Sequence, residues 1–305
     1  AGRDDYAFLL SSELRGKRSR QRALEMVALD PTAVTRPLLR TIRCSVAVSG
    51  TATPLSAYAE MLGFGDESVQ VSFQSPFSHQ TRIGVVVQGV DTSYNARSDE
   101  MFMRMVDHCV AVVEGTPGNT GIFTTSYGIA AALRRAGLEK KISKRLFLEK
   151  QDAGGKQNDE MIQEFRLQGN NGGAALLGVQ GGRNSEGGDF PGPTMESVVV
   201  VGVPYARPTP RIEALISFYD TLFDGKGRDY AYVLPAMTRA IQTAGRPVRR
   251  LNDRGVIVLL DQRFETPYLA RFMPPWLREI VQSIPDSPEM LSSLVKGFFK
   301  EVREE

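Results

Sequence analysis

The sequence is poor in the residues that build metal sites and covalent catalytic sites. It holds two cysteines, Cys44 and Cys109, and two histidines, His79 and His108, among 305 residues. Two cysteines cannot form a disulfide framework, a tetrahedral zinc site or an iron–sulfur cluster from this chain alone, and such low cysteine usage is typical of a reducing, intracellular compartment. Chemistry that depends on a histidine base is disfavoured for the same reason.

The chain also lacks a large net charge and a long apolar run. Its 37 Lys and Arg residues nearly balance 35 Asp and Glu residues, which leaves a formal charge of +2. Attraction to a polyanion must therefore come from local basic patches. No stretch approaches the length of a membrane span, and the first residues lack the basic-then-apolar layout of a signal peptide. We expect a soluble intracellular protein that makes no contact with a membrane.

No phosphate-binding loop of the form Gly-x-x-x-x-Gly-Lys-Ser/Thr is present. Each of the three Gly-Lys pairs, which begin at Gly16, Gly155 and Gly225, is followed by a residue other than Ser or Thr. There is no strand-borne Asp-Glu-Ala-His box either, because Asp99-Glu100 opens a predicted helix. A self-sufficient nucleotide hydrolase of the phosphate-loop type is therefore not expected.

What the sequence does contain is an alternation of short apolar, β-branched segments with longer helical patterns. The alternation predicts an α/β fold with a mostly parallel sheet and helices on both faces, in which ligands bind at the carboxyl ends of the strands. The predicted strands are residues 41–48, 83–88, 120–124, 145–148, 174–179, 197–203 and 256–260. The predicted helices are residues 54–62, 98–113, 127–136, 158–168, 210–223 and 229–244.

Both ends of the chain differ from the middle in their predicted secondary structure. We predict a helical amino-terminal stub over residues 1–40, which carries a basic run at Arg15, Lys17, Arg18, Arg20 and Arg22. A solvated face is the simplest meaning of such a run. Residues 41–286 are predicted to form the main domain and residues 287–305 a carboxyl-terminal helix. A Pro-rich stretch at 267–275 leads into two predicted amphipathic helices, 276–284 and 288–304, that cap the sheet.

The densest polar segment follows the predicted strand 174–179. Residues 181–192 read Gly-Gly-Arg-Asn-Ser-Glu-Gly-Gly-Asp-Phe-Pro-Gly. Glycines just past a strand let backbone N–H groups approach an anionic ligand, and a nearby carboxylate can hold a ribose hydroxyl. The segment does not spell Gly-x-Gly-x-x-Gly, so a flexible surface turn remains an equal alternative.

A second polar segment, Gln242-Thr-Ala-Gly245-Arg246-Pro-Val-Arg249-Arg250, ends the predicted helix 229–244. If one helical turn persists, Arg246 and Arg249 project from a single face, where two guanidinium groups can grip phosphate oxygens. The alternative is that arginines at the carboxyl end of a helix only complement its dipole.

Hydroxyl residues follow two further predicted strands. Ser49 and Thr51 follow the strand 41–48, and Ser126 and Tyr127 follow the strand 120–124. Residues of this kind suit contacts to a sugar–phosphate backbone, although helix capping and core packing explain them equally well.

The order and spacing of these blocks resemble the carboxyl-terminal half of XPD-type DNA helicases of superfamily 2. The most specific pair is Ser-Glu-Gly-x-Asp-Phe with Gln-x-x-Gly-Arg-x-x-Arg, and the resemblance covers residues 41–283. Gly188 stands where the family usually has an aliphatic residue, and Pro247 follows the first arginine. The further blocks that carry the resemblance are Ser-Gly-Thr-Ala-Thr-Pro from Ser49, Phe-Thr-Thr-Ser-Tyr from Phe123, Gly-Val-Pro-Tyr from Gly202 and Leu-Asp-Gln-Arg-Phe from Leu260.

The resemblance implies a RecA-like fold and a role for each block. By resemblance, Arg246 and Arg249 are arginine fingers that reach the γ-phosphate of ATP, and Gln242 helps to sense the nucleotide. The resemblance also implies that nucleotide binding and its link to DNA fall to Glu186, Gly187, Asp189 and Gly245. It implies contact with nucleic acid for Ser126, Tyr127 and Arg183. Coupling of hydrolysis to domain movement is implied for Ser49 and Thr51.

The resemblance also implies what lies outside this sequence. The chain looks like the second RecA-like motor domain of an ATP-dependent helicase that moves five-prime to three-prime on single-stranded DNA in nucleotide excision repair. ATP with magnesium is then shared with a first motor domain, and an iron–sulfur cluster belongs to that other part. Repair-complex proteins are possible partners, and the location is the cytoplasm in a prokaryote or the nucleus in a eukaryote. The strand 41–48 normally pairs within the first motor domain, so here it has lost its sheet.

Two other classes of protein stay open. One is a catalytically inactive, motor-like module that docks a partner protein or nucleic acid, although the presence of both Arg246 and Arg249 argues against a purely structural relic. The other is a nucleotide-cofactor oxidoreductase that uses the glycine-rich turn, which is disfavoured because the turn lacks the dinucleotide fingerprint.

Overall fold

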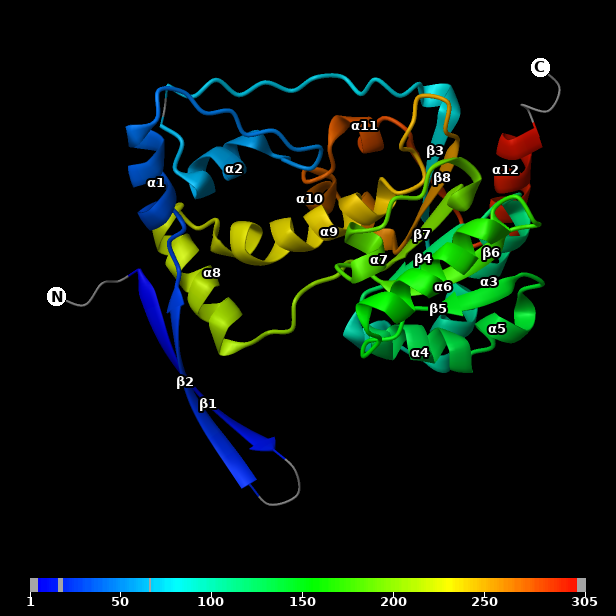
Figure 1. Ribbon diagram of the computed structural model, residues 1–305, viewed down its shortest axis with the longest axis horizontal. Coiled ribbons are helices and arrows are strands. Elements are labelled where there is room, and N and C mark those ends of the chain that lie inside the picture. Colours follow the sequence, from blue (N-terminus) through cyan, green and yellow to red (C-terminus); the bar gives the residue numbers. More distant parts are fainter. Residues whose placement is uncertain (1–4, 16–18, 66, 301–305) are drawn as a thin grey trace. The chain divides into compact units, whose positions relative to one another are not determined.

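The computed structural model describes residues 5–15, 19–65 and 67–300 (Figure 1). The chain divides into two compact units, which we describe separately. Unit 1 comprises residues 1–72 and 205–236, and unit 2 comprises residues 73–204 and 237–305. This division differs from the predicted one, in which residues 41–286 form one domain, because the segment 205–236 leaves the sheet and packs with the amino-terminal part of the chain.

Unit 2 is built on a seven-stranded parallel sheet with the order β5-β6-β4-β7-β8-β3-β9. The parallel α/β fold is thus confirmed. Six of the strands coincide with predicted ones to within two residues at each end. Their bounds are β3 Arg82–Val87, β4 Thr120–Thr124, β5 Arg145–Leu148, β6 Ala174–Val179, β7 Ser197–Val201 and β8 Gly255–Leu260.

Both faces of this sheet are buried. Alternate strand residues such as Val85, Ile122 and Leu177 pack with four helices in one continuous core. The residues between them, such as Phe123 and Val200, face the other way and are also fully buried. The four helices are α3 Asp99–Gly115, α4 Tyr127–Arg135, α5 Leu138–Lys141 and α12 Pro288–Lys300.

Most predicted helices of unit 2 are confirmed, and their ends have identifiable caps. Ser98 and Ser126 accept hydrogen bonds from Met101 N and Ile129 N and begin α3 and α4. The predicted carboxyl-terminal helix is confirmed as α12, whereas residues 301–305 lie outside the described residues. The remaining helices of more than one turn are α6 Gly155–Gln168 and α9 Leu234–Ala244, and the single turns are α7 Arg183–Glu186, α10 Pro267–Ala270 and α11 Pro275–Arg278.

The predicted helix 276–284 is wrong. Only the single turn α11 is helical, and the chain then forms the edge strand β9, Val281–Ile284, which pairs in parallel with β3. Gly84 on β3 makes this pairing possible, because a Cβ there would lie 2.7 Å from Val281 Cγ2. An open sheet edge therefore recruits a segment whose apolar spacing fits a helix equally well.

The helical stub predicted for residues 1–40 is also wrong over most of its length. In unit 1, β1 Tyr6–Arg15 and β2 Ser19–Ala28 form an antiparallel hairpin in which Phe8 pairs with Met26. The segment is rich in Leu, Ala, Glu and Arg, which favour helices, and cross-strand pairing overrides that preference. Among the described residues of this segment, α1, Thr32–Thr41, is the only helix. From the basic run, Lys17 and Arg18 lie outside the described residues.

The rest of unit 1 consists of helices and an extended segment. The predicted strand 41–48 is not a strand: residues 44–49 pair with no other described segment, and Val46 and Val48 are 86% and 89% exposed. A β-branched segment needs a neighbouring strand to complete its hydrogen bonds, and the two described strands of unit 1, β1 and β2, pair only with each other. The helices are α2 Leu55–Leu62, α8 Pro210–Leu222 and a π-helix, Asp229–Val233.

Candidate functional site

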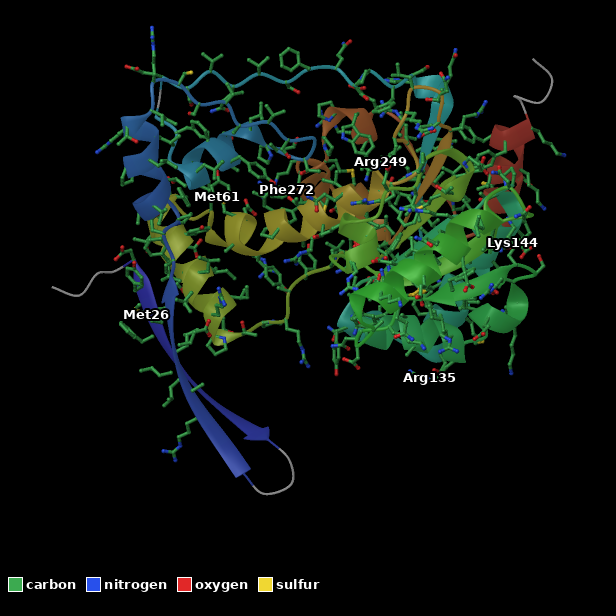
Figure 2. The ribbon with its side chains drawn as sticks, viewed as in Figure 1. Met26, Met61, Arg135, Lys144, Arg249 and Phe272 are labelled. Atoms are coloured by element: carbon green, nitrogen blue, oxygen red, sulfur yellow. The ribbon has the colours of Figure 1, made fainter. Side chains whose placement is uncertain are left out.

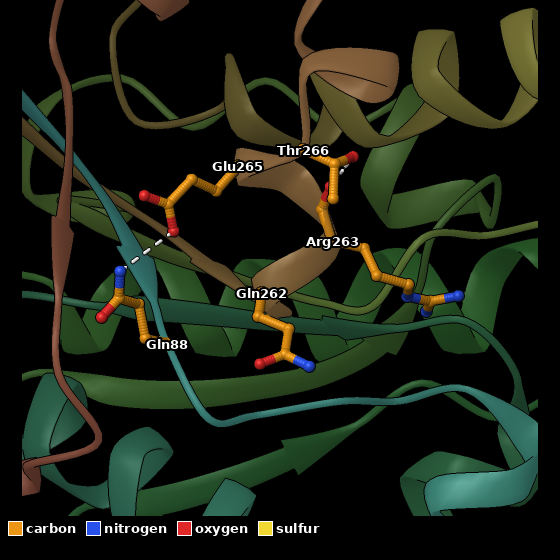
Figure 3. Close-up of a pocket in the computed structure, with 5 residues that line it drawn as sticks. All are labelled: Gln88, Gln262, Arg263, Glu265 and Thr266. Atoms are coloured by element: carbon orange, nitrogen blue, oxygen red, sulfur yellow. Dashed lines mark hydrogen bonds between the residues drawn. The ribbon is translucent and has the colours of Figure 1, made fainter.

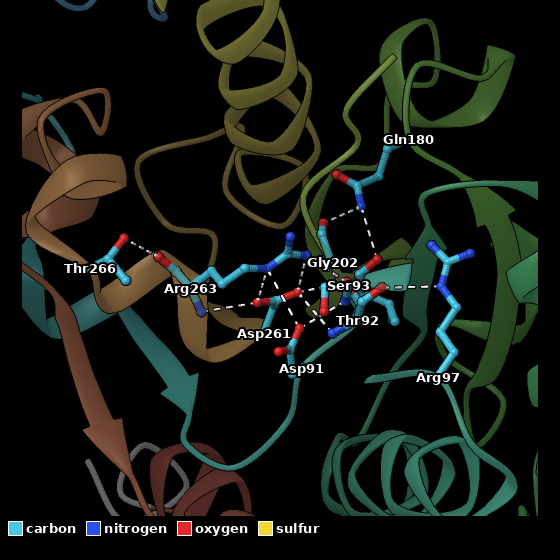
Figure 4. Close-up of polar contacts among 10 residues, drawn as sticks. Asp91, Thr92, Ser93, Arg97, Gln180, Gly202, Asp261, Arg263 and Thr266 are labelled. Atoms are coloured by element: carbon cyan, nitrogen blue, oxygen red, sulfur yellow. Dashed lines mark hydrogen bonds and ion pairs between the residues drawn. The ribbon is translucent and has the colours of Figure 1, made fainter. Parts of the chain in front are cut away.

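Half of the predicted site residues follow the carboxyl ends of two strands in unit 2: Ser126 and Tyr127 follow β4, and Arg183, Glu186, Gly187 and Asp189 follow β6. The side chain of Gln180, which follows β6, holds three strand ends together. Its Nε2 donates to the main-chain oxygens of Phe123 and Val201. It also donates to the main-chain oxygen of Gly202 at 2.9 Å (Figure 4). Ligands of parallel sheets bind at this edge. Gln180 was not among the predicted site residues.

The glycine-rich turn lies directly past β6 and is not a loose surface loop throughout. Residues Arg183–Glu186 form the single helical turn α7, and Phe190 is fully buried behind it. A Cβ on Gly188 would lie 2.3 Å from the Phe190 ring, so this position has no room for the aliphatic residue of the related family. Glu186, Gly187 and Asp189 are exposed. The turn therefore presents its polar side chains to solvent from a packed base.

Arg246 is buried and bonded to this turn. Its guanidinium donates to the main-chain oxygen of Glu186 at 2.6 Å and to that of Gly188, and only 5% of the residue is exposed. Burial, and then the charge of Arg249, lower the pKa of Arg246 to about 10. The Nε of Arg246 has no hydrogen-bond partner among the described residues. Arg246 therefore joins the Gln-x-x-Gly-Arg-x-x-Arg block to the glycine-rich turn.

Arg249 has the opposite surroundings. Helix α9 ends at Ala244, so the helical turn that would place Arg246 and Arg249 on one face does not persist, and that expectation is wrong. The loop is instead shaped by Asp253, whose Oδ2 accepts from Arg249 N at 2.8 Å and from Arg250 N at 2.7 Å. The Arg249 side chain is exposed (Figure 2). Gln242 and Gly245 are partly exposed near the same end of α9.

Tyr127 leads into a buried polar cluster that the sequence did not reveal. Its hydroxyl donates to Oε1 of Glu149 at 2.9 Å, and Oε2 of Glu149 accepts from Asn184 Nδ2 at 2.7 Å. Asn184 and Asn158 exchange two hydrogen bonds of 3.0 Å. Burial, and then Glu149, raise the pKa of Tyr127 to about 12. Glu149 follows β5 directly. A polar residue directly after a predicted strand is the signal in the sequence by which Glu149 could have been identified as a site residue.

The other predicted nucleic-acid contacts, Ser126 and Arg183, are exposed in unit 2. Ser126 also caps α4, as the simpler interpretation predicted. Arg135 lies at the far end of α4, at the edge of unit 2 (Figure 2). Three cations near this end of α4 form ion pairs: Arg134 with Glu139 at 2.9 Å, Lys141 with Asp107 at 2.6 Å, and Arg145 with Glu164 at 2.8 Å.

Ser49 and Thr51 lie in unit 1, in the extended segment after α1. Their hydroxyl oxygens are 3.2 Å apart, and Thr51 N donates to Ser49 Oγ at 3.1 Å. The two residues thus form a local turn and do not cap α2, for which no side-chain cap is present.

A second buried network occupies the ends of β3 and β8. Asp261 is fully buried, and its carboxylate accepts from Thr92 Oγ1 and from Arg263 Nη2, both at 2.6 Å (Figure 4). Beside it lies an open pocket of about 480 Å³ (Figure 3). Its lining residues are Gln88, Gln262, Arg263, Glu265 and Thr266, none of which is a predicted site residue.

The described residues contain no cluster of three or more His, Cys, Asp or Glu side chains that could hold a metal ion. Cys44 is exposed, and burial raises the pKa of the Cys109 thiol to about 12. Among the described helices, none is both long and apolar enough to cross a membrane.

This architecture is RecA-like and is similar to solved structures of XPD helicases. One of these superposes with a TM-score of 0.64 and 20% identity, covering 87% of this chain and 46% of that one. The helicase C-terminal domain family matches residues 109–280. The chain therefore belongs to the helicase C-terminal domain family.

Curated relatives extend the similarity over most of the chain. The ATP-dependent DNA helicase CHL1 of Meyerozyma guilliermondii is 25% identical over 302 residues, which cover 90% of this chain and 36% of that protein. The helicase subunit XPD of general transcription and DNA repair factor IIH from Schizosaccharomyces pombe is 25% identical over 292 residues, which cover 91% of this chain and 38% of that protein. The chain thus spans a little over a third of the length of these relatives.

Proposed function

We propose that this chain is the second motor domain of an ATP-dependent DNA helicase that moves five-prime to three-prime on single-stranded DNA in nucleotide excision repair. Membership in the helicase C-terminal domain family and the names of the relatives support the proposal. The observation that carries the proposal is the pair of hydrogen bonds from Arg246 to the main-chain oxygens of Glu186 and Gly188. These bonds join the two most specific sequence blocks, while Arg249 stays exposed.

In this proposal ATP is the substrate and lies between this domain and a first motor domain. Arg249 reaches the γ-phosphate, Arg246 sets the position of the loop that carries it, and Gln242 contacts the nucleotide. An arginine supplied across such a cleft accelerates phosphoryl transfer by about 10³- to 10⁵-fold, or about 4–7 kcal/mol of the barrier. Magnesium accompanies ATP in this proposal and is shared with the first motor domain. An iron–sulfur cluster is assigned to the other part of the helicase.

Single-stranded DNA is proposed to cross the edge that carries Ser126, Tyr127 and Arg183. The exposed Ser126 hydroxyl and Arg183 guanidinium suit phosphate oxygens, and the half-exposed ring of Tyr127 suits stacking on a base. Ser49 and Thr51 would couple hydrolysis to the movement of the domains. The first motor domain of the same protein and repair-complex proteins remain the proposed protein partners.

Binding of a fluorescein-labelled oligo(dT) to this chain, followed by fluorescence anisotropy, tests the DNA contact. We expect weak binding that falls steeply with salt, and Arg183→Ala should weaken it by roughly three- to tenfold and reduce the salt slope by about one ion. Arg135→Ala is the matched control, since Arg135 is an exposed arginine at the opposite end of the helix that Tyr127 begins. Equal effects of the two substitutions would contradict the assigned edge.

The same preparation tests the dependence on a first motor domain. Without a phosphate-loop lysine, the 305-residue chain should show no ATP hydrolysis above background, with or without DNA. Robust hydrolysis by the purified chain would contradict the proposal.

A further inference from the structure

We propose that Glu149 is a positioning residue that couples the DNA contact at Tyr127 to the glycine-rich turn and, through it, to Arg246. The inference rests on the proposed function, because it takes Tyr127 to face the DNA strand and Arg246 to belong to the ATP site. Neither the resemblance nor the relatives assign a role to Glu149.

The carboxylate of Glu149 contacts both sides of this path. The residue is 8% exposed, and its main-chain N–H extends the β5–β6 pairing by donating to Leu177 O at 2.9 Å. Oε1 accepts from the Tyr127 hydroxyl at 2.9 Å, and Oε2 accepts from Asn184 Nδ2 at 2.7 Å. One oxygen therefore serves the segment after β4, and the other serves the turn after β6.

The surroundings of Glu149 leave little room for independent adjustment. A Cβ on Gly182 would lie 2.5 Å from Oε1, and a Cβ on Gly178 would lie 3.0 Å from Oε2, so the backbone of β6 and its turn packs directly on the carboxylate. Asn184 is 2% exposed and is fixed from behind by its two bonds with Asn158. A displacement of the carboxylate must therefore move the turn.

The path continues to Arg246 without a break. Asn184 lies within α7, and Glu186 at the end of the same helical turn accepts from Arg246 through its main-chain oxygen at 2.6 Å. A strand of DNA that shifts Tyr127 would pull on Glu149, tilt α7 and change the position of Arg246. This arrangement gives a physical route by which bound DNA alters the ATP site.

Packing alone does not require a carboxylate at this position. A side chain of leucine has similar volume and would fill the space, but it would remove the acceptor of the Tyr127 hydroxyl and one of the two acceptors of Asn184 Nδ2. Glutamine keeps both contacts, because its oxygen can accept from Asn184 while its NH₂ donates to the Tyr127 hydroxyl oxygen. Glu149→Leu and Glu149→Gln therefore form a matched pair that separates hydrogen bonding from volume.

The test measures ATP hydrolysis by the full-length helicase with and without saturating oligo(dT), together with the Kd for fluorescein-labelled oligo(dT). For Glu149→Leu we expect the ratio of the stimulated rate to the unstimulated rate to fall by about fivefold or more, with the Kd changed less than about threefold. For Glu149→Gln we expect the ratio to stay within about twofold of the wild-type value. Thermal unfolding monitored by circular dichroism checks that each variant is folded.

Asn184→Leu repeats the test from the other end of the path, and it decides the matter if Glu149→Leu does not fold. If the contacts form one path, the double variant Tyr127→Phe/Asn184→Leu should lose no more stimulation than the worse single variant. Full stimulation in folded Glu149→Leu or Asn184→Leu, or additive losses in the double variant, would overturn the inference while the proposed function stands. A wild-type protein that DNA does not stimulate would overturn both.

Discussion

Arg246 and Arg249 lie three residues apart and do different things. Arg246 is 5% exposed, and its guanidinium donates hydrogen bonds to main-chain oxygens of the glycine-rich turn. Arg249 is exposed. The motif spacing predicts that both matter, but it does not predict which one faces solvent, because that depends on where α9 ends and on the bonds that Asp253 makes to the following loop. Arg249 is therefore the better position at which to test phosphate contact without disturbing the fold.

Tyr127 offers a pH-dependent test of the cluster around Glu149. Its pKa is raised to about 12 in the folded chain, from about 10 when unfolded, so its contribution to stability is complete below pH 10 and is lost as the pH rises through about 12. We expect the difference in free energy of unfolding between the wild type and Tyr127→Phe to shrink between pH 9 and pH 11.5, as measured by urea denaturation of the 305-residue chain. Tyr94→Phe is the control, because Tyr94 is 82% exposed. A difference that stays constant over this range would show that Tyr127 is not held by Glu149.

At the scale of elements, Asp261 ties the end of β3 to the end of β8. Its buried carboxylate accepts from Thr92 N and Oγ1 and from Arg263 N, Nε and Nη2. Asp261→Asn would remove the charge and place an NH₂ group, which can only donate, opposite some of the donors of Thr92 and Arg263. We therefore expect a loss of about 3 kcal/mol in the free energy of unfolding.

Urea denaturation measures this loss, and Asp107→Asn is the control. Asp107 pairs with Lys141 at 2.6 Å, but both side chains are more than 40% exposed, so its substitution should cost less than about 1 kcal/mol. If Asp261→Asn cost no more than Asp107→Asn, the network would not hold the two strand ends together.

How well an element can be predicted from the sequence depends on how it is buried. The strands β4, β6 and β7 are covered on both faces, and each reads as a short, mostly apolar run with turn residues on either side. The edge strand β9 is only partly buried, so its sequence carries no comparable signal. The hairpin of β1 and β2 depends on pairing between residues as far apart as Tyr6 and Ala28, which no local pattern reveals.

The candidate site shows the same limit. The glycine-rich turn and the arginine block are continuous segments, and their spacing identifies them. Glu149 and Asn184 are single polar residues 35 positions apart, and their contact depends on β5 and β6 lying side by side. The sheet order that brings them together cannot be read from either segment alone.

At the scale of the whole molecule, the two units divide the proposed roles. Unit 2 carries the sheet with Tyr127, the glycine-rich turn and both arginines, and unit 1 carries Ser49, Thr51 and the hairpin. One face of the hairpin exposes large apolar side chains, with Phe8 68% and Leu10 75% exposed. The residues proposed to complete the ATP site together with a first motor domain all belong to unit 2, so the central claim is tested there.

Steady-state ATP hydrolysis by the full-length protein carrying Arg249→Ala tests this claim most directly. In the presence of saturating single-stranded DNA, we predict that kcat falls by about 10³-fold or more, while the Kd for oligo(dT) changes less than about threefold and thermal unfolding is unchanged. Arg250→Ala is the matched control, because it removes the neighbouring exposed arginine and should leave hydrolysis within about twofold of the wild-type rate. Near-normal turnover in Arg249→Ala would contradict the account.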